Sequence, residues 1–140
     1  MRVQLAINVD DLEKSINYYT KLFGVEAHKI RDGYANFAID SPPLKLVLFE
    51  NPAAEQRLHH LGVEVFEAEE LVSARDRLSR AGIVEESRFG DTCCHATQDK
   101  IWSRDSQGVR WEWYRITDDT PTEPTQRSRC CIGQSSPEHF

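Results

Sequence analysis

Two cysteines stand side by side at Cys93 and Cys94, within the segment DTCCHATQDK, and a second adjacent pair lies at Cys130 and Cys131. These four are all the cysteines of the chain. Adjacent cysteines are poorly placed to close loops as disulfides, whereas reduced thiolates are good ligands for soft metals and metalloids. The pattern therefore predicts ligand chemistry by reduced thiols in a reducing compartment.

Two thiols that act together need a particular backbone. Adjacent residues of a regular strand point to opposite faces, so Cys93 and Cys94 can bind one atom only from a turn or an irregular loop. Gly90 and Asp91 precede them and favour a loop over residues 91–100, able to close over a bound ligand. A redox-inert pair or a vicinal disulfide is the alternative interpretation.

A second group of candidate ligands lies on three expected strands. In QLAINV, alternation places Gln4 on the face opposite the apolar residues, and in HLGVEV it does the same for His60. Small residues, Ala6 and Gly62, follow two positions later and leave room. In VRWEWYR, Glu112 is a carboxylate among aromatic residues, which is costly to bury unless it is paired or bound to a metal. Gln4, His60 and Glu112 could therefore form a three-ligand metal site.

Simpler roles exist for each of these residues. Gln4 could be an ordinary hydrogen-bonded strand residue, and Glu112 could pair with Arg110 or Arg115 along its own strand. His59 should face away from His60, because neighbours on a strand alternate, and so is expected to be a structural histidine.

The elements that position these residues occur twice. QLAINVDDLEKSINYYTKLFGVE and HLGVEVFEAEELVSARDRLSRAGIVE each contain a six-residue strand, an acidic helix start and an amphipathic helix that ends at glycine, Gly24 or Gly82. Runs with β character follow at 25–30, 34–39, 44–50, 83–88, 94–103 and 109–114. The predicted fold class is therefore α+β, with two tandem βαβββ modules around a shared metal cavity.

The predicted domain covers residues 1–116, with modules at about 2–51 and 58–116. Residues 117–140 are polar and rich in Pro, Ser and Thr, which predicts a flexible tail that includes Cys130 and Cys131. The 23 acidic and 17 basic residues give a net charge of −6 without a basic block, so nucleic acid is not an expected partner. Without a long apolar segment, the expectation is a cytoplasmic monomer or homodimer away from the membrane.

Two motifs carry a resemblance to a known family. The pattern xLxxNVxDLxKSxxYYxxLFG opens the first module and HLGVEV opens the second, and over about residues 2–115 the chain resembles the vicinal oxygen chelate superfamily of glyoxalases and extradiol dioxygenases. Within it, CCHATQDKIW followed by WEWY looks like the organoarsenical carbon–arsenic lyases and the cadmium-induced proteins.

This resemblance implies a specific activity, which would confer arsenical resistance. Cys93 and Cys94 would capture a trivalent organoarsenical such as methylarsenite. Gln4, His60 and Glu112 would hold non-haem Fe(II), or another divalent metal such as Ni, Co or Zn. Dioxygen would then be used to cleave the carbon–arsenic bond and release arsenite. His95 or Lys100 could stabilise the reactive thiolates.

Two other functions fit the same residues. One is a thiolate-based cadmium or arsenite binding protein without turnover, and the other is a glyoxalase-type metal-dependent isomerase. Glyoxalases use a fourth protein ligand from the last strand of the first module, where KLVLFE offers Leu46, Val47 or Leu48. Three protein ligands would leave open metal positions, as non-haem Fe(II) oxygenases require.

Overall fold

A computed structural model describes residues 1–93 and 95–121 of the 140-residue chain. The first module contains β1 (Arg2–Val9), α1 (Leu12–Phe23), β2 (Lys29–Arg31), β3 (Tyr34–Ile39) and β4 (Leu44–Glu50). The second module contains β5 (Leu58–Glu64), α2 (Ala68–Arg80), β6 (Glu86–Cys93), β7 (Ala96–Arg104) and β8 (Arg110–Asp118). The prediction of two βαβββ modules is confirmed.

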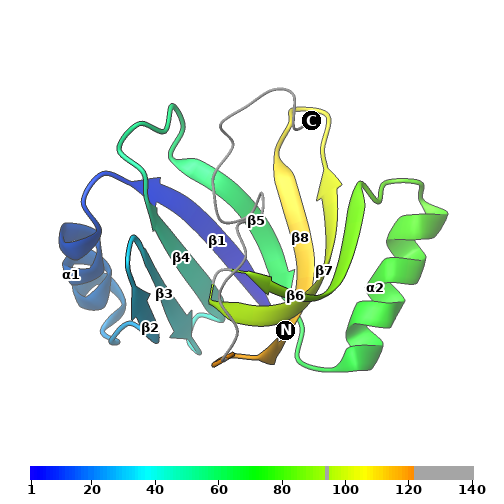
Figure 1. Ribbon diagram of the computed structural model, residues 1–140, viewed down its shortest axis with the longest axis horizontal. Helices are drawn as coiled ribbons and strands as arrows, with labels where there is room; N and C mark the ends of the chain where they lie inside the picture. Colours follow the sequence, from blue (N-terminus) through cyan, green and yellow to red (C-terminus); the bar gives the residue numbers. More distant parts are fainter. Residues whose placement is uncertain (94, 122–140) are drawn as a thin grey trace.

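The eight strands of the described residues form one curled sheet in the order β2-β3-β4-β1-β5-β8-β7-β6, with α1 and α2 at its two outer ends (Figure 1). The first strands of the modules, β1 and β5, pair antiparallel at the centre. In each module the first and last strands pair in parallel, β1 with β4 and β5 with β8. The two modules are thus arranged alike on either side of the β1–β5 seam, which brings equivalent strands together.

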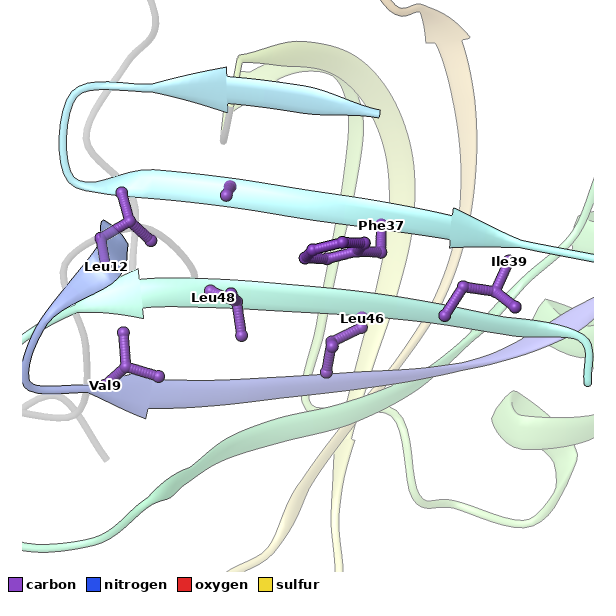
Figure 2. Close-up of a cluster of buried hydrophobic side chains, with 7 residues drawn as sticks. Val9, Leu12, Phe37, Ile39, Leu46 and Leu48 are labelled. Atoms are coloured by element: carbon purple, nitrogen blue, oxygen red, sulfur yellow. The ribbon is translucent and has the colours of Figure 1, made fainter. Parts of the chain in front are cut away.

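The helix α1 is fixed at both ends and covers the apolar face of the first module. The side chain of Asp11 accepts a hydrogen bond from the backbone N–H of Lys14, and Gly24 ends the helix with a φ of 70°. Figure 2 shows side chains of β1, β3 and β4 gathered beside the start of α1. The buried cluster consists of Val9, Leu12, Ala35, Phe37, Ile39, Leu46 and Leu48, with Leu5 and Ile7 packed against it.

The second module repeats this layering. Glu67 and Glu70 form a capping box at the start of α2. On the apolar side of this helix, Leu71 and Leu78 pack with Val65 and Ile101 in a second core. The helices cover one side of the sheet. Because side chains alternate along each strand, every second residue points to the opposite side. That opposite side carries the polar residues of β1, β4, β5 and β8.

Several boundaries differ from the sequence prediction. The first short β run was expected at 25–30, but the strand β2 found there covers only Lys29–Arg31. The last strand, β8, continues to Asp118, two residues past the expected end of the domain at 116. Residues 91–100, expected as a loop, lie mostly in the paired strands β6 and β7. None of the helices in the described part of the chain is long and apolar enough to span a membrane. Residues 122–140 of the predicted tail, with Cys130 and Cys131, lie outside the described residues.

Candidate metal and thiol site

One cavity lies between the two modules on the polar side of the sheet. Its walls include all three predicted metal ligands, together with several buried cations and hydroxyl groups: Gln4, Lys45, His60, Lys100, Glu112 and Tyr114. The cavity volume of about 20 Å³ accommodates a water molecule or a metal ion, but not a large organic group.

The three predicted ligands meet in this cavity. The Nε2 atom of His60 lies 3.1 Å from Oε1 of Gln4 and 3.5 Å from Oε1 of Glu112. Gln4 is 6% exposed, and His60 and Glu112 are 2% exposed. Pairing across the sheet explains this proximity, because Gln4 pairs with Gly62 and Gly62 pairs with Glu112. The structure thus brings the three side chains together, and their role as metal ligands stays a prediction.

Gly62 is the residue that permits this approach. A Cβ atom built at Gly62 would collide with Oε1 of Gln4 and would lie 2.9 Å from the backbone oxygen and 3.0 Å from Cγ of Glu112. The sequence indicated that the small residue leaves room for something bound. The space is instead filled by the end of the Gln4 side chain and by the backbone oxygen and Cγ of Glu112.

The protonation states of the group suit metal binding. Burial raises the pKa of Glu112, but the charge of Lys100 and hydrogen bonding to His60 and Gln4 outweigh it, so the pKa lies below its ordinary value. Burial lowers the pKa of His60 despite the hydrogen bond and charge of Glu112. A carboxylate, a neutral imidazole and an amide oxygen therefore face one point.

These donors fit a divalent metal. Metal bonds to nitrogen and oxygen of about 2.0–2.2 Å place neighbouring ligand atoms roughly 3.0–3.4 Å apart, close to the distances from His60 to Gln4 and Glu112. The Oε2 atom of Glu112 is buried without a hydrogen-bond partner among the described residues. Within residues 1–93 and 95–121, no three His, Cys, Asp or Glu residues are placed to hold a metal ion by themselves, and the third donor at this site is the amide of Gln4.

The register of the sheet identifies the position of a fourth ligand. Ala6 pairs with Val47 in the first module as Gly62 pairs with Glu112 in the second. Leu46, Val47 and Leu48 were the residues considered from sequence for this position, and the register shows that Val47 is the equivalent of Glu112. Val47 lines the cavity but has no donor atom, so this strand supplies no fourth ligand there.

His59 departs from the predicted orientation. Ala6 pairs with His60 and Ile7 pairs with Leu58, so the intervening His59 occupies a bulge rather than the opposite face of a regular strand. Its Nδ1 atom lies 2.8 Å from Nδ1 of His60. The expectation that His59 faces away from His60 is wrong, because strict alternation breaks at this bulge.

This contact bears on how His60 binds a metal. If Nε2 of His60 binds a metal, the proton of the ring is carried by Nδ1, which then donates a hydrogen bond to Nδ1 of His59. Burial, with smaller effects of His60 and Arg110, lowers the pKa of His59 to about 2. His59 therefore stays a neutral acceptor and fixes the ring of His60.

Cys93 adjoins the cavity through its backbone. Cys93 ends β6 and pairs with Ala96, which lines the cavity, and its carbonyl accepts a hydrogen bond of 3.0 Å from Nε2 of Gln98. The side chain is 0% exposed and is disulfide-bonded, unlike the reduced thiol expected from sequence. Reduction must therefore precede any binding of a metalloid by this sulfur. Cys94 lies outside the described residues.

The hairpin that carries Cys93 is tied to the first module. His95 has a φ of 65°, and its carbonyl accepts a hydrogen bond of 2.7 Å from Nζ of Lys29. Burial, together with Arg31 and Lys29, lowers the pKa of His95, so it is a poor source of positive charge for a thiolate. Lys100, 3.8 Å from Asp91, is the buried cation on this hairpin.

Several residues of the cavity were missed from sequence. Lys45 shares a strand face with Val47 and Phe49, so alternation along β4 could have identified it. Lys29 and Asp119 lacked any such signal, because they lie on a short edge strand and just beyond β8. The Nζ atom of Lys29 donates a 2.8 Å hydrogen bond to Oδ1 of Asp119, and both residues line the cavity.

The fold and site define a class of protein: tandem βαβββ modules in a curled sheet, with a candidate metal cavity between the modules. The chain belongs to the Glyoxalase/Bleomycin resistance protein/Dioxygenase superfamily, whose family model matches residues 2–113. Among solved structures, catechol 2,3-dioxygenase matches with a TM-score of 0.57 and 18% identity, covering 94% of this chain and 45% of that chain. This last match supports the fold alone.

Sequence relatives give a finer comparison. The chain is 48% identical to "Cadmium-induced protein CadI" of Mycobacterium tuberculosis over 143 residues, covering 95% of this chain and 94% of that protein. It is 45% identical to "Trivalent organoarsenical cleaving enzyme" of Thermomonospora curvata over 137 residues, covering 96% and 91%. The resemblance to both groups inferred from sequence motifs is confirmed.

Proposed function

We propose that this protein cleaves the carbon–arsenic bond of trivalent organoarsenicals such as methylarsenite, with Fe(II) and dioxygen, and releases arsenite. The observation that carries the proposal is the convergence of Gln4, His60 and Glu112 beside the hairpin of Cys93. The name of the Thermomonospora curvata relative supports the same chemistry. The activity would confer arsenical resistance in the cytoplasm.

The two thiols would hold the substrate. Trivalent arsenic prefers sulfur ligands, and methylarsenite carries two hydroxyl groups that Cys93 and Cys94 can replace, each with release of water. The carbon group stays on arsenic in this step. Because Cys93 pairs with Ala96 on the cavity wall, arsenic held by this sulfur would lie beside the cavity that contains the candidate metal ligands.

The remaining groups would prepare the reaction. Gln4, His60 and Glu112 would hold Fe(II), which supplies redox chemistry with dioxygen and, with three protein ligands, keeps positions open. Glu112 contributes the negative charge, while His59 orients His60 through the Nδ1 contact. The burial of all three ligand side chains excludes bulk water.

The overall reaction balances without a further reductant. One methylarsenite and one dioxygen contain the atoms of one arsenite and one formaldehyde, with the carbon oxidised and dioxygen reduced. Equal amounts of the two products are therefore expected.

A second function is favoured by one specific comparison. The cadmium-induced relative is 48% identical to this chain, and thiolate binding of cadmium or arsenite without turnover would need only the cysteines. The buried set of Gln4, His60 and Glu112 favours the enzyme, because sequestration by thiols does not require it. A glyoxalase-type isomerase is less well supported, since Val47 stands where the fourth ligand would come from.

Cysteine variants test the proposed division of roles. Cys93→Ser and Cys94→Ser should each abolish arsenite release while retaining the iron content of the wild-type protein. The double variant Cys130→Ser/Cys131→Ser is the matched control, because it removes the other adjacent pair, and it should keep full activity. Unchanged activity in the Cys93 and Cys94 variants would refute arsenic capture by these thiols.

A further inference from the structure

Lys45 is a buried cation with no assigned role. It is 4% exposed, lines the cavity and pairs with the candidate ligand Gln4 across β1 and β4. No described residue forms a hydrogen bond or an ion pair with its ammonium group. A buried ammonium group without a counter-ion is strongly unfavourable. Its pKa is accordingly lowered by burial, an effect that the charge of Glu64 partly offsets.

The other charges around the cavity are already engaged. Lys29 pairs with Asp119 at 2.8 Å, and Lys100 lies 3.8 Å from Asp91. Glu64, the acidic group that acts most on Lys45, is held by Arg2 at 2.7 Å. Lys45 is therefore the cation of this cavity that lacks an anion among the described residues, and a divalent metal would add further positive charge.

Tyr114 offers a second donor in the same cavity. The residue is 1% exposed, and its hydroxyl has no hydrogen-bond partner among the described residues. A carboxylate can accept hydrogen bonds from both an ammonium and a hydroxyl group.

We propose that Lys45, together with Tyr114, forms a subsite for an acidic group on the organic part of the substrate. The preferred substrates would then be small organoarsenicals whose carbon group carries a carboxylate, with arsenic on the thiols and the carboxylate at Lys45. This inference rests on the proposed function, because the thiols must hold the arsenic.

Binding measurements without turnover test the subsite. The full-length protein, with reduced thiols and loaded Fe(II), is kept under nitrogen and titrated with trivalent carboxymethyl and 2-carboxyethyl arsenicals. Each acid is compared with its neutral carbamoyl analogue of nearly the same shape. The wild-type protein should bind at least one acid roughly 10- to 100-fold more tightly than its amide, the effect of one hydrogen bond between charged groups. Equal binding of acid and amide overturns the subsite.

Variants then assign the preference to Lys45. Lys45→Met should bring the ratio of acid to amide affinity close to one, and Lys45→Arg, which keeps the charge, should retain much of it. Lys21→Met, on the exposed surface of α1, should leave the ratio unchanged. The ratio compares two ligands on the same variant, so a general loss of stability does not imitate the effect. A preference that persists in Lys45→Met contradicts the proposal.

The outcomes also separate this inference from the proposed function. If no arsenical binds, arsenic capture by the thiols fails, and the subsite fails with it. If all bind with no preference for the acids, the proposed function stands and only the subsite is overturned.

Discussion

The substitution Gly62→Ala should disrupt the metal site through a single methyl group. The added Cβ would overlap Oε1 of Gln4 and lie 2.9 Å from the backbone oxygen of Glu112. The side chain of Gln4 can rotate away, but the backbone oxygen moves only if β8 shifts from β5. Overpacking of this kind costs about 1–3 kcal/mol of folding stability. Displaced ligands should weaken metal affinity about 10- to 100-fold.

A matched substitution separates the local effect from general destabilisation. Gly82 has a φ of 71°, and no atom lies within 4 Å of a Cβ built there. Gly82→Ala should thus cost roughly 1–2 kcal/mol through backbone strain and leave the site untouched. Urea unfolding gives the stability of each variant, and Co²⁺ titration against a chelator gives the affinity. If Gly62→Ala binds Co²⁺ as tightly as Gly82→Ala, the reasoning about this cavity is refuted.

Three further substitutions test other parts of the site. Glu112→Gln keeps the shape but removes the charge, and should lower Co²⁺ affinity by more than about 100-fold; a change below tenfold argues against Glu112 as a ligand. His59→Phe removes the partner of the His60 Nδ1 atom and should weaken Co²⁺ binding about 10- to 100-fold, whereas unchanged affinity would leave His59 a packing residue. Burial raises the pKa of Asp119, but the hydrogen bonds from Lys29 and His28 outweigh this effect, so the pKa lies below 3.8. The ionised Asp119 therefore stabilises the fold above pH 3.8, and this contribution is lost as the pH falls through the lowered pKa. Asp119→Asn should therefore unfold more easily than wild type in urea at pH 7, and the difference should shrink below about pH 4; a constant difference would contradict this role.

The sequence predicted the parts of the site that depend on repetition and alternation. Gln4 and His60 occupy the same position in two similar strands, and Glu112 stands on an equivalent inner face, so their convergence follows from the duplication. From sequence, Gly62 was expected only to leave space beside the candidate ligands. Its contact with Gln4 and Glu112 depends on how closely the three strands pair.

Other features arise from tertiary pairing and have no local signal. His59 is turned by a bulge between β1 and β5, which alternation along one strand does not predict. Residues 91–100 contain turn-forming residues, yet pairing with β7 extends β6 as far as Cys93. Asp119 belonged to a segment expected to be a flexible tail, but its ion pair with Lys29 holds it at the cavity.

The most direct test of the proposed function is arsenic speciation after methylarsenite is mixed with the reduced protein, with and without Fe(II) and dioxygen. We expect arsenite, with an equal amount of formaldehyde, only when both Fe(II) and dioxygen are present. Methylarsenite that is recovered unchanged but bound to the protein under all conditions would contradict the account and identify a sequestration protein instead.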